Sequence, residues 1–318
     1  MKRFAIFLIT VFAFGLPVFA QTETVTINQG VALLKSKDYR KANEIFRELA
    51  MRPPVSAEVY YNLGVSEFRL GNFDRAIEAL DDALKIRPDD PQAFLFMGFS
   101  LENTERYAAA VSFFDRVLAA TPENFDAWLE KGVCQFRMND HLAAIKSMQQ
   151  AIRIEPTAAY GHRKLADVYY QRGLYPEAAV SYKTADRLEP NVFYINFRIA
   201  NSYYNDRRYA ESLPYFKKSC ELEPRNPTAS YMLGSALLAA GQYQAAIDAF
   251  NKTLEINPEH GEAIYGTGTA YLKMQNPAAA TGVLESLRKI NYLLYSDLDT
   301  AIKAQLAKPK TKTKKARS

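Results

Sequence analysis

One proline recurs at a fixed interval of 34 residues through most of the chain. The prolines on this interval are Pro54, Pro88, Pro122, Pro156, Pro190, Pro224 and Pro258. A fixed period of this length indicates a repeat protein, in which each unit is one supersecondary structure stacked on its neighbours. The interval therefore constrains the fold before any other motif is considered.

Small and bulky residues recur with the same period. With units numbered 1 to 34 from residue 23, position 8 holds Gly30, Gly64, Gly98, Gly132, Ala166, Ala200, Gly234 and Gly268. Position 20 holds Ala42, Ala76, Ala110, Ala144, Ala178, Ser212 and Ala246, and position 24 holds Phe46, Leu80, Phe114, Met148, Tyr182, Phe216 and Phe250. The small residues allow two helices to approach closely, and the bulky residue fills the space beside that contact.

Apolar and small residues within a unit have helical spacing. They fall at positions 4, 7, 8 and 11, and again at positions 17, 20, 24 and 27. Each unit is therefore expected to be a helix, a turn and a second helix. Gly71, Gly173 and Gly241 lie in three of the turns, where glycine easily adopts a left-handed cap. The proline at position 32 ends the second helix.

This pattern resembles the tetratricopeptide repeat (TPR) family, and the unit 57–90 matches it best through Tyr60, Leu63, Gly64, Ala76, Leu80 and Pro88. The resemblance covers eight contiguous units, 8 × 34 = 272 residues: 23–56, 57–90, 91–124, 125–158, 159–192, 193–226, 227–260 and 261–294. It implies an all-α, right-handed superhelical solenoid over residues 21–294. Only the terminal units depart from the pattern, at Thr26, Gln29, Pro277 and Tyr292.

The N-terminus has the pattern of a secretory signal peptide. Lys2 and Arg3 precede an apolar run, and Val18, Phe19 and Ala20 follow Gly15 and Pro17. Residues 1–20 are expected to be removed after Ala20, which favours a periplasmic or secreted protein. The alternative is a retained membrane anchor, although the uninterrupted apolar stretch is short for spanning a bilayer.

The C-terminus is expected to hold a capping helix and a disordered tail. Ser296 and Asp299 resemble a capping box, and Leu298, Ile302 and Leu306 follow with helical spacing, so a helix is predicted over residues 295–307. Residues 308–318 lack large apolar side chains and are expected to be disordered.

The positive charge of the chain is concentrated at its ends. The net charge is +5, of which the signal contributes +2 and the stretch from Lys303 contributes +7, leaving 5 − 2 − 7 = −4 for residues 21–302. Specific nucleic-acid binding is therefore not indicated. The basic tail, Lys308–Ser318, is either a solvated segment or a weak contact to an anionic surface.

Residues that could support catalysis or bind a cofactor are not indicated. Cys134 and Cys220 are more than two units apart and are expected to be buried free thiols. His141, His162 and His260 are not spaced as metal ligands. The repeats leave too few residues for a catalytic domain, and no catalytic motif occurs, so the sequence predicts no enzyme, cofactor or metal site.

The resemblance implies that positions 2, 5, 6, 9, 12 and 13 of each first helix face a concave partner-binding groove. Position 9 is apolar in the first four units and polar in the last four: Val31, Val65, Phe99 and Val133, then Asp167, Asn201, Ser235 and Thr269. The main contact region is predicted at Tyr160, Arg163, Asp167, Tyr170, Tyr194, Phe197, Arg198, Asn201, Tyr204 and Asn205. A secondary apolar region is predicted at Tyr61, Phe68, Phe99 and Phe136.

Other interpretations of these positions remain open. The aromatic residues could pack between repeats, and Arg163 and Asp167, four residues apart, could simply pair on the helix surface. Asp167 stands where a clamp for a C-terminal carboxylate would need a neutral amide, which argues against such a clamp.

The predicted function is that of an exported, non-enzymatic scaffold in the cell envelope. Its partner would be a protein or peptide segment in the groove, because aromatic residues interleaved with Arg and Asn favour such contacts. A glycan or cell-wall polymer, stacked on the aromatic rings, is the alternative ligand.

Overall fold

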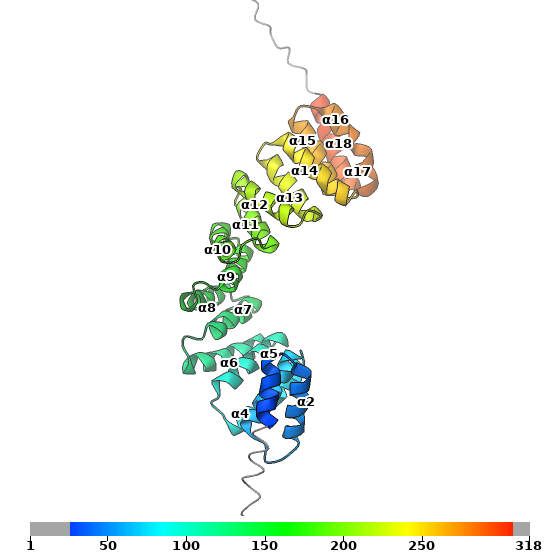
Figure 1. The fold of residues 1–318 in the computed structure, drawn as a ribbon. Helices are drawn as coiled ribbons and strands as arrows, with labels where there is room; N and C mark the ends of the chain where they lie inside the picture. The colour runs from blue at the N-terminus through cyan, green and yellow to red at the C-terminus, as the bar shows by residue number, and fades with distance from the viewer. Residues whose placement is uncertain (1–25, 308–318) are drawn as a thin grey trace, which may run out of the picture. The chain divides into compact units, whose positions relative to one another are not determined.

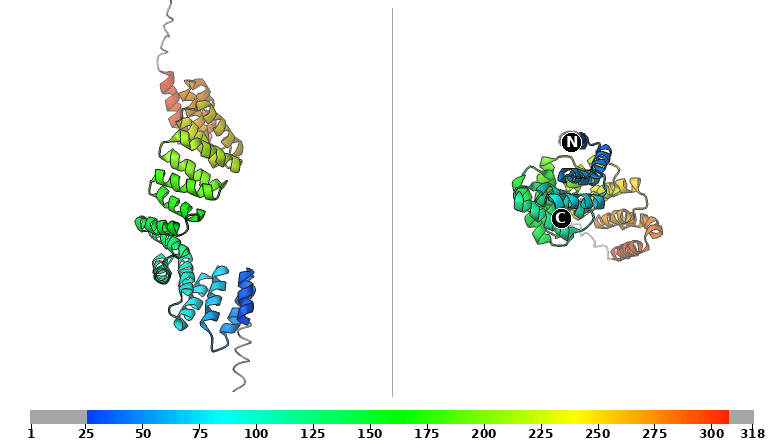
Figure 2. Two further views of the ribbon diagram at one scale, coloured as in Figure 1. Left: turned by 60° about the vertical axis from the view of Figure 1, so that its left-hand side comes forward. Right: turned by 90° about the horizontal axis from the view of Figure 1, so that it is seen from below.

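The computed structural model describes residues 26–307, and the predicted signal peptide and basic tail lie outside this range. The described residues form helices without a strand. They divide into two compact units between Pro156 and Thr157. Successive helices pack as antiparallel neighbours within each unit (Figures 1 and 2). The expected all-α architecture of helix-turn-helix repeats is confirmed.

The first unit begins with helical residues 26–35. Its further helices are α2 (Tyr39–Ala50), α3 (Ala57–Arg69), α4 (Phe73–Ile86), α5 (Pro91–Asn103), α6 (Tyr107–Ala120), α7 (Phe125–Arg137) and α8 (His141–Ile154). Among them α3, α5 and α7 begin 34 residues apart. Side chains of Ser56, Asp90 and Asn124 accept hydrogen bonds at these three starts, so local capping sets the helix boundaries.

The second unit contains four first helices with the same spacing: α9 (Ala159–Gln171), α11 (Phe193–Asn205), α13 (Pro227–Ala239) and α15 (Gly261–Lys273). The second helices are α10 (Tyr175–Leu188), α12 (Tyr209–Leu222) and α14 (Tyr243–Ile256). The unit closes with α16 (Pro277–Gly282), α17 (Leu284–Ile290) and α18 (Tyr292–Leu306).

Glycine at position 8 permits the close contact inside a helix pair. A Cβ atom on Gly98 would lie 2.5 Å from Cε1 of Phe114, whose side chain is fully buried. Phe250 occupies the same place above Gly234, where an added Cβ would lie 2.6 Å from its ring. The bulky residue at position 24 therefore packs directly on the backbone of the first helix, as the sequence pattern indicates.

The turn inside every repeat contains one residue in the left-handed region. Gly71, Gly173 and Gly241 adopt it with φ of 81°, 72° and 78°. The other repeats use side-chain-bearing residues at this same position 15, with φ between 59° and 67°: Lys37, Glu105, Asn139, Arg207 and Gln275. The repeat geometry thus imposes the left-handed conformation even where the sequence offers no glycine.

The C-terminal cap differs from the expectation. The last helix begins at Tyr292 rather than near residue 295, and the side chain of Asn291 accepts a hydrogen bond from the Leu294 amide at 3.2 Å. Ser296 lies within this helix and does not cap it. Asn291 is itself extended and separates α17 from α18, and because its side chain accepts the Leu294 N–H, the last helix starts earlier than expected.

The reason for the different cap lies in the eighth repeat. Its second helix is interrupted at Val283, and α16 contains only small residues after Pro277. The bulky residue that packs on Gly268 is instead Leu298 of α18, which is 1% exposed. Helix α18 therefore supplies the packing that a second helix supplies elsewhere. Among residues 26–307, no helix combines the length and apolar character needed to cross a membrane.

Candidate functional site

The ten residues of the main predicted region lie on α9 and α11, the first helices of the fifth and sixth repeats. On each helix they follow one stripe, because residues three and four apart share a face. We refer to these ten residues together with Lys164 as the α9–α11 surface. All of them belong to the second unit, so the surface is formed within one compact body.

Asp167 joins three helices. The hydroxyl of Tyr182 on α10 donates a hydrogen bond to Oδ1 of Asp167 at 2.5 Å, and the hydroxyl of Tyr194 on α11 donates to the same oxygen at 2.6 Å. Tyr182 is fully buried. Burial, together with the nearby Asp167 carboxylate, raises the pKa of both tyrosines, so both phenols stay protonated and remain donors.

Cations lie over the tyrosine rings of this surface. The Arg198 guanidinium is 4.9 Å from the centre of the Tyr170 ring and 5.1 Å from that of Tyr194. Arg163 and Lys164 lie 5.1 and 5.0 Å from the centre of the Tyr160 ring. Such contacts hold a cation without neutralising its charge.

The surface has an excess of positive charge. Arg163, Lys164 and Arg198 form no ion pair with any residue between 26 and 307. Asp167 is the one acid of the α9–α11 surface. Three cations and one anion give a formal charge of 3 − 1 = +2 at this surface. The alternative, a helix-surface ion pair of Arg163 with Asp167, is not formed, and Oδ1 of Asp167 instead accepts hydrogen bonds from two tyrosine hydroxyls.

Two tyrosines are the most accessible aromatic residues of this surface. Tyr160 is 39% exposed and Tyr194 is 36% exposed, both large values for aromatic side chains in a folded unit. Tyr170 is less exposed and accepts a hydrogen bond from Nδ2 of Asn205 at 2.8 Å. The exposed rings lie beside cations, so both apolar and charged contacts are offered to a partner.

Other residues of the region mainly pack inside the repeats. Phe197 stacks on Phe193 with ring centres 5.5 Å apart and contacts Phe216 edge-on. Tyr204 packs against Phe216 and Tyr209. Asn201 is 8% exposed and donates to the carbonyl of Phe197 at 2.8 Å. The packing interpretation thus applies to these three residues.

The secondary apolar region is only partly brought together. Phe68 lies 6.0 Å from Phe99, ring centre to ring centre. Phe96 of α5 contacts both of them and also Tyr61, at 5.6 to 6.0 Å. Phe136 on α7 instead contacts His141, at 5.4 Å. Tyr61, Phe68 and Phe99 therefore form one aromatic cluster around Phe96, which the sequence reasoning did not single out although Phe96 is at groove position 6.

The structure adds Tyr182 to the candidate residues, and it supports Lys164, which the sequence places in the same contact region. Tyr182 lies at position 24, where the repeat pattern requires only a large side chain. The pattern does not explain why this side chain carries a hydroxyl group. A buried hydroxyl needs a partner, and this requirement was a signal that could have pointed to Asp167. Lys164, at position 6, is a candidate because it lies over the Tyr160 ring together with Arg163.

The cysteines and His260 take part in packing and helix capping. Both cysteines are free; Cys134 is buried as expected, whereas Cys220 is partly exposed. His260 caps α15 by accepting from the Ala263 amide at 3.3 Å, and it stacks on Tyr231. Within the described residues, no group of three or more His, Cys, Asp or Glu side chains could hold a metal ion.

The fold and surface define a class of helix-pair repeat proteins that present side chains from successive first helices. Family models described as tetratricopeptide repeat match residues 27–91, 98–159, 135–192, 197–261 and 237–302. The chain belongs to the tetratricopeptide repeat family. A search of curated proteins gave no match.

Solved structures show the same fold. The C-terminal part of a TPR repeat-containing protein from Cytophaga hutchinsonii is 20% identical, with a TM-score of 0.64, covering 76% of this chain and 98% of that one. YrrB, described as a TPR protein with an unusual peptide-binding site, is 20% identical, with a TM-score of 0.53, covering 59% of this chain and 97% of that one. MamA is 24% identical, with a TM-score of 0.50, and the match covers 53% of this chain and 92% of that one.

Proposed function

We propose that this protein is a non-enzymatic scaffold that binds an acidic protein segment on the α9–α11 surface. Its repeat family is one of protein-protein interaction modules, typically without catalytic activity. The observation that carries the finer proposal is the set of three cations without an ion-pair partner, lying over tyrosine rings. An aromatic and Arg-rich surface is the usual composition of an interaction hot spot.

Charge decides the chemistry of the partner. Arg163, Lys164 and Arg198 would each gain a charge-assisted hydrogen bond from a carboxylate, whereas a basic segment would be repelled. Asp167 does not reverse this preference, because its single negative charge is outnumbered by the three cations of the surface. Apolar side chains of the same segment would pack on Tyr160 and Tyr194.

The proposal includes the place of action. The signal-like pattern of residues 1–20 supports export, and we propose that the scaffold acts in the periplasm or the wider cell envelope. The similarity to YrrB, whose description mentions a peptide-binding site, supports a peptide rather than a folded surface as the ligand.

Photo-crosslinking in cells tests this function. A photoreactive amino acid at Tyr160 or Tyr194 is expected to give protein adducts whose partner peptides are rich in Asp and Glu. The matched control is Val180, which is 67% exposed on the neighbouring second helix α10. Equal adducts from Val180 and Tyr160 would refute the assignment, as would adducts confined to glycan, which would favour the alternative ligand.

A further inference from the structure

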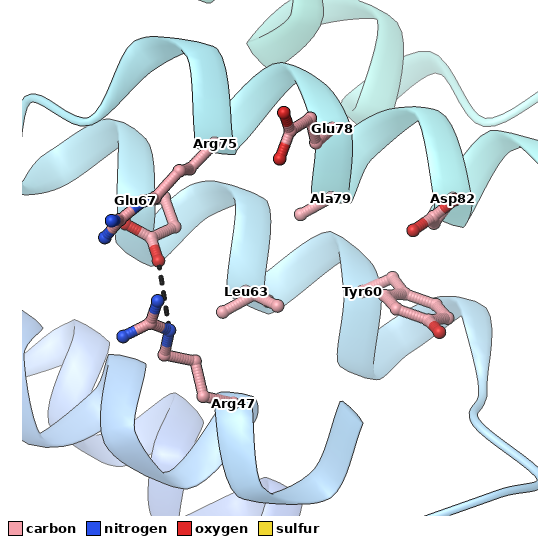
Figure 3. Close-up of a pocket in the computed structure, with 8 residues that line it drawn as sticks. All are labelled: Arg47, Tyr60, Leu63, Glu67, Arg75, Glu78, Ala79 and Asp82. Atoms are coloured by element: carbon pink, nitrogen blue, oxygen red, sulfur yellow. Dashed lines mark ion pairs between the residues drawn. The ribbon is translucent and has the colours of Figure 1, made fainter. Parts of the chain in front are cut away.

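A polar cleft lies in the first unit, away from the groove positions. It has a volume of about 230 Å³ and is lined by α2, α3 and α4. Its lining residues are Arg47, Tyr60, Leu63, Glu67, Arg75, Glu78, Ala79 and Asp82 (Figure 3). Those from α3 occupy positions 4, 7 and 11, the packing stripe rather than the groove stripe. We call it the Glu67 cleft.

The cleft contains a buried carboxylate, that of Glu67, at a position where most other repeats have a packing side chain. The side chain of Glu67 is 3% exposed, whereas position 11 holds Leu33, Leu101, Tyr169, Tyr203, Leu237 and Tyr271 in six other repeats and Gln135 in the remaining one. Burying a carboxylate costs free energy that a leucine would not cost. Asn72 donates to Oε2 of Glu67 at 2.7 Å, and Nε of Arg47 lies 3.5 Å from Oε1. The Arg47 contact is long for a charge-assisted bond.

Comparison with the next repeat explains why the cleft is open. There, position 23 holds Phe113, whose ring packs 6.1 Å from that of Phe94. Arg116, at position 26, lies 3.7 Å over the Phe94 ring and donates to the carbonyl of Pro88. In the Glu67 cleft the corresponding positions 23 and 26 hold Ala79 and Asp82, which are too small to fill the same space.

The charges of the cleft are separated along its length. Figure 3 shows Arg47 and Arg75 beside Glu67 at one end, Asp82 and Tyr60 at the other, and Leu63 with Ala79 between them. Arg75 and Asp82 are seven residues apart on α4, which places their backbones on the order of 10 Å apart on nearly the same face.

Several of these groups lack partners. Among residues 26–307, Arg75 and Glu78 form no ion pair, and the hydroxyl of Tyr60 forms no hydrogen bond. Asp82 is shared with Lys85, whose Nζ lies 2.7 Å away. Within the described part of the chain, the cleft thus offers Arg75 as the unpaired cation at one end, Glu78 and the Tyr60 hydroxyl as unpaired groups for an ammonium, and Leu63 and Ala79 as an apolar floor between the two ends.

We propose that the Glu67 cleft binds a short zwitterionic peptide of about three residues, whose extended length is about 10 Å. Its carboxylate lies at Arg47 and Arg75, its ammonium at Asp82, Glu78 and Tyr60, and its central side chain on Leu63 and Ala79. This site is independent of the α9–α11 surface, because it is built from the other unit and recognises charge at both ends of the ligand.

Calorimetric titration of the full chain with Ala-Leu-Ala tests the site. A ligand of this size is expected to bind with Kd on the order of 1 mM. Acetylating its amine or amidating its carboxylate is expected to weaken binding about tenfold, because each removes one charged end. Equal affinity for the free and doubly capped peptides, or no binding of the free peptide, would overturn the proposal.

Variants make the test specific. Arg75→Ala removes an exposed side chain and is expected to weaken Ala-Leu-Ala about tenfold without altering the circular dichroism. Arg40→Ala, at an exposed site on α2 outside the cleft, is the matched control and is expected to leave the affinity unchanged. Equal affinities for Arg75→Ala and Arg40→Ala would contradict the assignment.

Discussion

The hydroxyl of Tyr182 donates a hydrogen bond to Asp167 from the buried interior of the fifth repeat. This bond connects the packing residue at position 24 with the surface residue at position 9. Asp167 is thereby held in place by two hydrogen bonds, one from Tyr182 of α10 and one from Tyr194 of α11. The order of the α9–α11 surface therefore depends on the core of the repeat beneath it.

Replacing Asp167 should destabilise the protein through Tyr182. In Asp167→Ala the buried hydroxyl loses its acceptor, and the free energy of unfolding is expected to fall by about 1–3 kcal/mol in urea titrations. Tyr182→Phe in the same background should recover part of this loss, because no unsatisfied donor then remains. Strict additivity of the two changes would contradict a direct coupling.

Adding a methyl group at position 8 should disturb the helix pair. Gly98→Ala brings a Cβ atom to 2.5 Å from the buried Phe114 ring, and the expected loss of unfolding free energy is about 1–3 kcal/mol. Gly282→Ala is the control, since no atom lies within 4 Å of the added Cβ. A gain in stability for Gly98→Ala, as expected for an ordinary exposed helix, would show that the contact is not tight.

Glycine should be preferred at the left-handed turn residue. Glu105 has φ of 60° and is exposed, so Glu105→Gly is expected to raise the free energy of unfolding by about 0.5–1 kcal/mol. Ser112→Gly, at an exposed position within α6, should have the opposite sign. Thermal denaturation of the two variants compares these effects, and a loss in Glu105→Gly would refute the strain at this turn.

The two thiols should react slowly. Burial raises the pKa of both Cys134 and Cys220 above the usual range, so less thiolate is present at a given pH than in a free cysteine. With a thiol-specific chromophoric reagent, both should react faster as the pH rises, and the buried Cys134 should react later than the partly exposed Cys220. Reaction of Cys134 at the rate of free cysteine in the folded protein would contradict its burial.

Local signals predicted the repeat architecture well. Prolines, turn glycines and the small residue at position 8 act within one unit, so a single sequence reveals them. The left-handed conformation at Glu105 or Arg207 is less visible, because these residue types do not favour it and only the neighbouring helices impose it.

Contacts between distant elements could not be predicted in the same way. The partner of Asp167 is Tyr182 rather than Arg163. The buried hydroxyl of Tyr182 needs a hydrogen-bond acceptor inside the protein, whereas the partly exposed Arg163 can be solvated by water. The cap was also displaced, since the second helix of the eighth repeat is interrupted just before Leu284 at position 24, and Leu298 packs on Gly268 instead. Asn201 appeared available for a ligand, yet its amide is bonded to its own helix.

The central claim is that the α9–α11 surface selects acidic segments, and fluorescence anisotropy tests it most directly. A labelled peptide of alternating Glu and Phe should bind the full chain, and its Lys counterpart should bind at least about tenfold more weakly. Binding should weaken with added salt, because exposed charges are screened within about 10 Å at 0.1 M salt. Substituting Arg163, Lys164 and Arg198 together by Ala should abolish the preference for Glu. Equal binding of the two peptides to the unaltered chain, or an unchanged preference in the triple variant, would contradict the account.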